Sequence, residues 1–527
     1  MKNFKQLGIA TAVAAVSASY VGLAQAQVTY PSTNLGDAAI VPYYTTQGDF
    51  TTGVHIINTS DMTQVVKLRL RRGSDSMDAL DFNIIMSPKD EWVGNIDDSS
   101  GTITVTTDDT TCTAPLTNGV FPMPALYSAG AEEGYIEIIG MGSIDVVSPI
   151  GAASKHTSAG VPLNCVAAES NFFRVATLAP VPGSSANGIH SSILAHQTCT
   201  DDVSAALNGP ADQGCVINAT PVLPNTLGDT GNVLKVAYHI RDTASGLEMG
   251  GNAVHLADFA TTAMLSNQES QIIGSPDLYG YFFPDLNGGS PVDPTTAPAR
   301  MTTFEAVRTT LGATSIINDW SVAAARNVST DWVVTLPGQY VMLDLGRYTT
   351  SLFDATKPCY TDLEIAAVNA TEPTAQSCDW RDLPVTVSPI EIWDREEQTF
   401  INPQGGLVIS PDVSGTPAST VFPNEVNVVE WTAGENAPVL DSVYNQSFDT
   451  SALGADFGWA ELSVSATALK TQGIYNFTAG APGVGNTAFT PIVETAIPVV
   501  GFVAWERSFP SDPSANYGRL VDHSYGS

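Results

Sequence analysis

The residues of this chain that could carry chemistry are acidic side chains set among turn-forming residues. They form four groups: Asp97 with Asp98, Asp108 with Asp109, Asp201 with Asp202, and Asp285 with Asn287 and Asp293. Hard cations such as Ca²⁺ take six to eight oxygen ligands from flexible loops. The four groups are therefore candidate calcium loops. The alternative for each is a solvated turn, in which the acidic or amide side chain accepts hydrogen bonds from its own backbone.

The sequence contains no motif for a chemical reaction. The seven histidines include no HExxH pair, and neither a GxSxG elbow, a Walker A loop nor a GxGxxG after a predicted strand occurs. Two carboxylates could serve as a glycosidase dyad, but among 54 acidic residues such pairs arise by chance. We therefore expect a protein that is not an enzyme.

The cysteines fit an oxidising compartment. There are six, Cys112, Cys165, Cys199, Cys215, Cys359 and Cys378. An even number in an exported chain predicts disulfides, and six cysteines allow fifteen pairings. The simplest pairing is sequential, which joins the first to the second, the third to the fourth and the fifth to the sixth. A zinc cluster is disfavoured because there is no CxxC and no histidine at ligand spacing.

One segment concentrates positive charge. Lys67, Arg69, Arg71 and Arg72 are four of the 21 basic residues and lie within six positions. The first three alternate with apolar residues, which predicts a strand over 64–72 with one basic face. Such a face could bind an acidic surface of a neighbouring copy or the phosphates of lipopolysaccharide. It could equally be an edge strand whose charges prevent unwanted pairing.

The overall charge is strongly negative although few residues are charged. The 527 residues include 54 acidic and 21 basic side chains, a net charge of −33 from a charged fraction of 14%, against about 25% in an average globular chain. Such a surface repels nucleic-acid phosphates. It also repels anionic lipid unless divalent cations bridge the two. With 43% hydrophobic residues the chain can still fold around a core.

The beginning of the sequence predicts export. Lys2 and Lys5 precede an apolar stretch over 7–23, and Ala24-Gln25-Ala26 fits a signal-peptidase site with cleavage after Ala26. No later apolar run reaches the 18 residues of a transmembrane helix. We therefore expect a secreted protein with no transmembrane segment.

Short strands account for most of the remaining chain. Runs rich in valine and threonine are interrupted often by the 77 glycines and prolines, which predicts a mainly β, multi-domain β-sandwich architecture. Helical spacing is confined to 302–312 and 251–268. We expect a signal peptide at 1–26, an N-terminal β-sandwich at 27–180, a Ser/Gly/Pro-rich connection with a cysteine loop at 181–230, and a larger β-rich domain with short helices at 231–527.

Several segments resemble a known family. They are Gly36–Thr45, Ile57–Ser60, Leu80–Asn83, Ser87–Asp90, Thr330–Pro337, Pro498–Phe502 and Asn516–Gly518. Together they resemble exported surface-layer proteins of marine gammaproteobacteria. The resemblance implies a structural subunit that assembles with identical copies into a two-dimensional array on the Gram-negative outer surface, is shed into biofilm matrix, and often depends on divalent cations. It implies no active-site residues.

Two other functions remain open. A secreted adhesin or glycan-binding protein would use exposed aromatic residues, for which Tyr279, Tyr281, Phe282 and Phe283 are candidates unless they belong to a core. A secreted hydrolase is the third function class. The leading hypothesis is the surface-layer subunit, with Ca²⁺ assisting assembly.

Overall fold

The computed structural model describes the chain in several stretches. These are residues 28–76, 78–125, 127–169, 227–261, 263–264, 284–286, 288, 302–338, 385–397, 420–433, 437–465 and 497–526, together with eight short strands. The predicted signal peptide at 1–26 lies outside the described residues. The fold is mainly β with few helices, as the sequence predicted.

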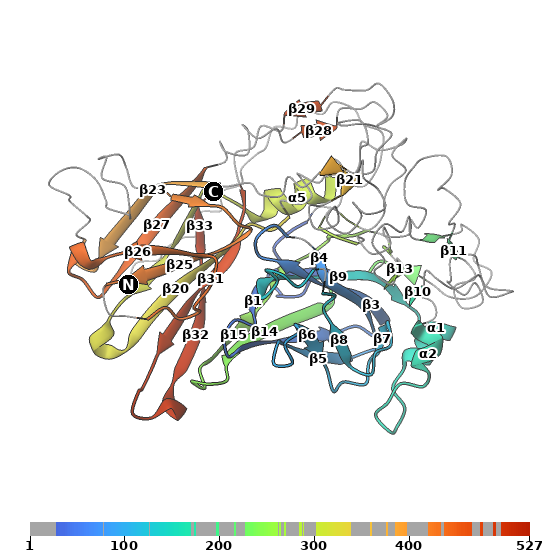
Figure 1. The fold of residues 1–527 in the computed structure, drawn as a ribbon. Coiled ribbons are helices and arrows are strands. Elements are labelled where there is room, and N and C mark those ends of the chain that lie inside the picture. Colours follow the sequence, from blue (N-terminus) through green and yellow to red (C-terminus); the bar gives the residue numbers. More distant parts are fainter. Residues whose placement is uncertain are drawn as a thin grey trace, which may run out of the picture.

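Two antiparallel sheets form an N-terminal sandwich (Figure 1). The first has the order β16 (Val254–Leu256), β1 (Ala38–Thr45), β9 (Glu133–Ile144), β3 (Thr63–Arg72), β4 (Asp78–Met86) and β7 (Cys112–Ala114), and β13 (Leu227–Gly228) also pairs with β9. The second has the order β15 (Glu248–Asn252), β14 (Leu234–Asp242), β2 (Phe50–Asn58), β5 (Glu91–Asp97), β6 (Thr104–Thr106) and β8 (Val120–Pro122).

The two N-terminal sheets differ in burial. In β14 buried apolar residues alternate with more exposed ones, the pattern of a sheet with one solvent-facing side. In contrast, every residue of β1, β3, β4 and β9 is buried. The first sheet is therefore covered on both faces, which decides the environment of its charged residues.

A second sandwich follows, with its two sheets opposite each other on the left of Figure 1. One sheet has the order β24 (Thr420–Phe422), β23 (Val385–Asp394), β27 (Phe457–Ser465), β19 (Ser315–Ser321) and β33 (Ser524–Gly526). The other has the order β26 (Asn445–Asp449), β25 (Val426–Thr432), β20 (Val328–Thr335), β31 (Val500–Arg507) and β32 (Tyr517–Asp522). Trp320, Trp332 and Trp431 are buried and pack together, with ring centroids 5.1 and 5.9 Å apart.

The remaining elements are short. The helices are α1 (Pro149–Ser154), α2 (Cys165–Glu169) and α5 (Thr302–Leu311), with 3₁₀ turns at Ala324–Arg326, Ser451–Leu453 and Pro513–Ala515. Small strand pairs are β10 (Phe173–Arg174) with β17 (Gln268–Glu269), β11 (Gln197–Cys199) with β12 (Cys215–Ile217), β18 (Gly312–Ala313) with β30 (Ile497–Pro498), β21 (Cys359–Tyr360) with β22 (Gln376–Ser377), and β28 (Tyr475–Phe477) with β29 (Phe489–Pro491).

The structure moves one expected domain boundary. We expected the second domain to begin at 231, but β14 pairs along its whole length with β2, and β16 pairs with β1. Residues 234–256 therefore complete the N-terminal sandwich. The helical expectation for 251–268 is wrong where the chain is described, because β15 and β16 occupy its first part. The helix expected at 302–312 is confirmed as α5, with Phe304, Val307 and Leu311 buried.

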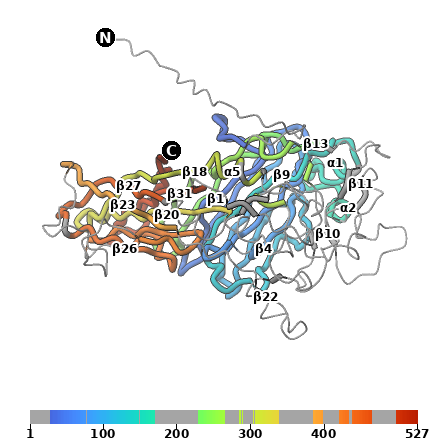
Figure 2. Tube along the Cα trace, turned by 90° about the horizontal axis from the view of Figure 1, so that it is seen from above, coloured from blue at the N-terminus to red at the C-terminus, as the bar shows by residue number. Residues whose placement is uncertain are grey.

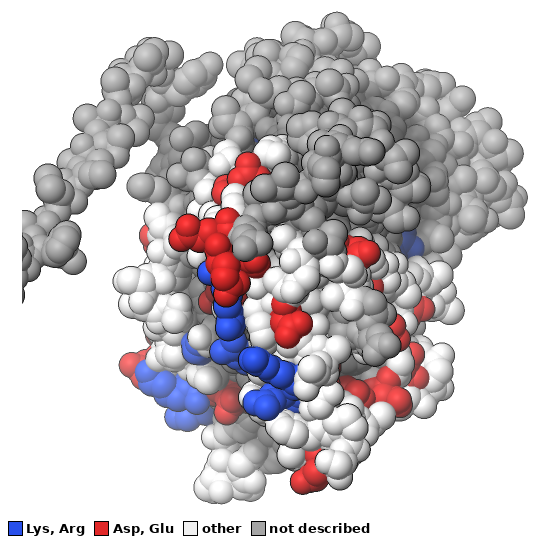
Figure 3. Space-filling model, turned by 90° about the vertical axis from the view of Figure 1, so that its left-hand side faces the viewer, with Lys and Arg blue, Asp and Glu red and all other residues white. Residues whose placement is uncertain are grey.

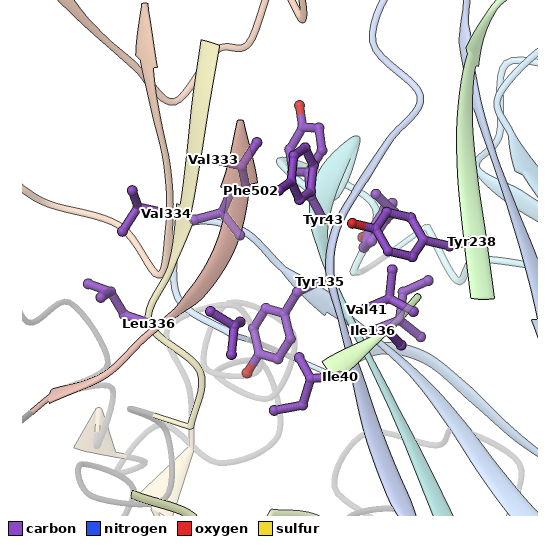
Figure 4. Close-up of a cluster of buried hydrophobic side chains, with 14 of the residues drawn as sticks. Ile40, Val41, Tyr43, Tyr135, Ile136, Tyr238, Val333, Val334, Leu336 and Phe502 are labelled. Carbon is purple, nitrogen blue, oxygen red and sulfur yellow. The ribbon is translucent and has the colours of Figure 1, made fainter. Parts of the chain in front are cut away.

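The two sandwiches lie side by side and share one hydrophobic core (Figure 2). Phe502 of β31 packs against Tyr43 of β1 and Tyr238 of β14, with ring centroids 6.4 and 6.1 Å apart (Figure 4). The Thr335 hydroxyl donates a hydrogen bond to the Pro42 carbonyl at 2.6 Å. A junction that buries aromatic rings from both sides holds the two sandwiches as one block.

Candidate functional site

The predicted basic strand is β3, and it lies inside the molecule. It pairs with β9 on one side and β4 on the other, so it is not an edge strand. Lys67 and Arg69 have no exposed surface, and Arg71 and Arg72 are 3% and 9% exposed. Binding to a neighbouring copy or to lipopolysaccharide requires accessible side chains. The prediction that these four residues form a docking face is therefore wrong.

Acidic residues on the adjacent strands neutralise this basic strand. Strand register places Arg69 opposite Asp81 of β4 and Glu137 of β9. The ion pairs are Lys67–Asp81 at 3.0 Å, Arg69–Asp81 at 3.2 Å, Arg69–Asp78 at 3.1 Å, Arg71–Glu137 at 3.0 Å, and Arg72 with Asp75. We refer to these residues as the buried charge layer. Four bases meet four acids, so the layer adds nothing to the net charge of the molecule.

Burial sets the proton affinities in the layer. Desolvation lowers the pKa of Lys67 to about 8, although Asp81 partly offsets it. Desolvation also raises the pKa of Asp78 to about 6, against the influence of Arg69 and Arg71. A buried ion pair adds little net stability, but removing one partner leaves an uncompensated charge. The ion pairs therefore link β3 to both of its neighbours, β4 and β9.

A second buried carboxylate joins the two sandwiches. Glu133, at the start of β9, accepts hydrogen bonds from the Tyr43 hydroxyl at 2.7 Å, from the Val443 N–H at 2.8 Å and from the Ser442 hydroxyl. Burial raises the pKa of Glu133, and these donors partly offset the shift. One side chain of the N-terminal sandwich thus holds the loop before β26 of the second sandwich.

Two carboxylates of the candidate calcium loops, those of Asp97 and Asp109, accept hydrogen bonds from nearby residues. Asp97 accepts hydrogen bonds from the Asn95 amide and the Ser99 N–H, each at 3.1 Å, and Asp109 accepts one from the Thr111 N–H at 2.7 Å. Strand β6 separates Asp97 and Asp98 from Asp108 and Asp109. Asp285 is buried.

Calcium binding remains a prediction. Asp201, Asp202, Asn287 and Asp293 lie outside the described residues. Within the described stretches, no three His, Cys, Asp or Glu side chains are grouped to hold a metal ion.

One predicted disulfide is confirmed. Cys112 of β7 is bonded to Cys165 of α2. For the second, the antiparallel pairing of β11 with β12 places Cys199 opposite Cys215 in the backbone register. In the third, Cys359 pairs with Gln376, and Cys378 lies outside the described residues. The second and third disulfides remain predictions.

The aromatic residues proposed for glycan binding, Tyr279, Tyr281, Phe282 and Phe283, also lie outside the described residues. A different aromatic group lies on the outer sheet of the C-terminal sandwich. Trp393 of β23 and Trp459 of β27 are cross-strand neighbours whose rings stack 4.0 Å apart, and Trp459 is 40% exposed. Beside them, the guanidinium groups of Arg395 and Arg326 lie 4.3 and 5.2 Å from the centre of the Phe457 ring.

A matching group lies on β31 and β32. The Arg519 guanidinium is 4.8 Å from the Trp505 ring, and that of Arg507 is 5.2 Å from the Phe509 ring. Tyr517 packs against Trp505 with ring centroids 5.6 Å apart and is 45% exposed. We name Arg326, Arg395, Arg507 and Arg519, with the rings beneath them, the arginine surface. Figure 3 shows Lys and Arg side chains gathered on this side of the molecule, below a group of acidic ones.

Sequence reasoning missed the arginine surface, although a signal was present. Trp393-Asp394-Arg395 and Trp505-Glu506-Arg507 share the pattern tryptophan, acid, arginine at the ends of two predicted strands. Residues two apart on a strand point to the same side, so each motif indicates a tryptophan and an arginine on one face of a sheet. In the fold, the two arginines lie over the rings of Phe457 and Phe509.

Comparison with known proteins found no matching family model, no similar curated protein and no similar solved structure. No helix among the described residues is long and apolar enough to cross a membrane.

Proposed function

We propose that the chain is a structural, non-enzymatic subunit that assembles with identical copies into a two-dimensional array on the outer surface of a Gram-negative cell, and that shed arrays contribute to biofilm matrix. The observation that carries the proposal is the junction between the sandwiches. A lattice repeats only if each subunit keeps one shape. A core shared across Tyr43, Tyr238 and Phe502, with Glu133 bonded across the junction, supports such a rigid block.

The charge distribution gives divalent cations a role in this assembly. The buried charge layer is balanced, so the net charge of −33 belongs to the rest of the chain. Close packing of such subunits is opposed by charge repulsion, which Ca²⁺ bound between copies or in surface loops would relieve. Divalent cations would also bridge the array to lipopolysaccharide phosphates. This role does not require the β3 side chains.

Electron microscopy of the purified protein tests the proposal. With millimolar Ca²⁺ we expect ordered sheets, and with a chelator we expect dispersed particles. Mg²⁺ and NaCl at matched ionic strength separate specific binding from screening. A protein that stays dispersed in Ca²⁺, from cells whose surface shows no regular array, would refute the proposal.

A second function is favoured by one observation. The stacked pair of Trp393 and Trp459, with Trp459 40% exposed, offers an aromatic face of the kind that binds sugar rings. An adhesin or glycan-binding protein would bind immobilised polysaccharide without forming ordered sheets. Loss of binding in Trp459→Ala, with unchanged binding in Trp92→Phe at a buried site, would support this alternative.

A further inference from the structure

We infer that the arginine surface docks on an acidic face of a second copy of this chain, in a head-to-tail contact. This inference rests on the proposed self-assembly and names the surface that drives it. It starts from the contrast between two sets of cations. The four bases of the buried charge layer all have acidic partners within the chain. Arg326, Arg395, Arg507 and Arg519 form no ion pair with any described residue.

Such a set of arginines is unexpected in a chain with 54 acidic and 21 basic residues. Acids outnumber bases by more than two to one, so an exposed guanidinium has many carboxylates available along the chain. Instead, each of these four lies over an aromatic ring, at 4.3 to 5.2 Å from its centre. The ring supports one face of the planar group, worth about 0.5–1 kcal/mol at an exposed site. In Arg326, Arg395 and Arg519, which are exposed, the N–H groups at the edge stay available for carboxylates, whereas the Nε of Arg507 is buried.

The four arginines belong to one continuous surface. Arg326 connects the two groups of rings: its guanidinium lies over Phe457, and the adjacent Asn327 carbonyl accepts a hydrogen bond at 3.0 Å from the N–H of Ser508, which follows Arg507. On β31 and β32, Trp505 is directly opposite Arg519, and Arg507 opposite Tyr517. The surface therefore lies at one end of both sheets of the C-terminal sandwich, where β23 and β31 end and β27 and β32 begin.

Charge complementarity selects the occupant. An acidic partner is required, and the largest source of acid at a crowded array is the same protein, with its net charge of −33. A sugar chain fits less well, because guanidinium groups already cover faces of Phe457, Phe509 and Trp505. The inferred contact joins this surface to a different, acidic face of the second copy, and such heterologous contacts extend into open assemblies when they do not close into a ring.

Charge-reversal variants test the inference. In Arg395→Glu with Arg519→Glu, two exposed members of the surface change sign. The matched control is Lys155→Glu with Lys235→Glu, which changes the net charge equally on the N-terminal sandwich. Sedimentation velocity at rising protein concentration, in low salt without Ca²⁺, measures pairwise self-association. We expect the control to associate within about threefold of wild type, and the arginine variant at least about tenfold more weakly. The milder pair Arg395→Gln with Arg519→Gln provides a folded substitute if reversal prevents folding.

The outcomes separate this inference from the proposed function. Equal association of the arginine variant and wild type overturns the inference, even if wild type forms ordered sheets. Weakened association supports it, even if microscopy shows that wild type forms chains instead of sheets and the array proposal fails. A wild type that is monomeric at every concentration in this Ca²⁺-free buffer overturns the inference, and a wild type that also stays dispersed in Ca²⁺ overturns the proposed function. Polygalacturonate is the probe for an acidic polysaccharide, and its binding to the arginine surface without self-association overturns the inference.

Discussion

Glu133 offers the sharpest test of the rigid junction. Replacing it with alanine removes the acceptor shared by the Tyr43 hydroxyl, the Ser442 hydroxyl and the Val443 N–H, so that all three lose their bond to a buried carboxylate. Each unsatisfied buried donor costs about 1–3 kcal/mol. Part of this cost is offset because a carboxylate whose pKa is raised by burial no longer has to be desolvated. We expect Glu133→Ala to lower the free energy of unfolding by about 3–5 kcal/mol.

Urea denaturation measures this change. Of the eight tryptophans, only Trp92 precedes residue 320, so tryptophan fluorescence reports mainly on the C-terminal sandwich, and hydrogen exchange by mass spectrometry reports on both. We expect wild type to unfold in one transition and Glu133→Ala to show early exchange in the loop before β26. The control is Glu132→Ala, which removes the same charge from a partly exposed neighbour and should cost less than about 0.5 kcal/mol. Equal midpoints for the two variants would refute the junction argument.

Three further changes test other parts of the structure. Lys67→Met should destabilise the fold by about 2–3 kcal/mol, because the buried Asp81 carboxylate loses one of its two basic partners and keeps Arg69. Lys67→Met combined with Asp81→Leu should cost less than the sum of the two single variants in the same urea assay, and additive losses would argue against a paired role. Burial raises the pKa of Asp331 to about 8, above that of an unfolded aspartate, so its contribution to stability is full below about pH 4 and is lost as pH rises through 8. Thermal melts of Asp331→Asn should therefore depend less on pH than wild type, and parallel curves would contradict this. Cys112→Ser with Cys165→Ser opens a loop with a sequence separation of 53 and should lower the free energy of unfolding by about 4 kcal/mol. Reduction of the wild-type disulfide should lower the melting temperature in the same way, and equal melting temperatures with and without reductant would contradict the prediction.

The local pattern of the sequence predicted individual elements well. The strand expected at 64–72 is β3 to within one residue, and the helix expected at 302–312 is α5 to within one residue. Alternating apolar residues predict a strand, and apolar residues at helical spacing predict a helix, from a short stretch of sequence. These predictions hold in the fold because the apolar faces that they identify are the ones that pack in the core.

The candidate site was predicted less well because it depends on partners distant in sequence. The alternation of Lys67, Arg69 and Arg71 with apolar residues indicates a strand with one solvent-exposed face. In the fold, Asp81 and Glu137 come from strands on either side and allow burial of the whole strand. In the same way, Trp393 meets Trp459 only through the pairing of β23 with β27. A single sequence does not specify which strands become neighbours.

The order of strands has a consequence for how the chain reaches its folded state. The first sandwich is closed by β14 and β16, and β20 pairs with β31, which follows it by more than 160 residues. The sheet that contains β19 is completed by β33 at Ser524–Gly526. Contacts so distant along the chain form slowly, because loop closure must precede them. The second sandwich therefore stays incomplete until synthesis of the chain reaches its last strands.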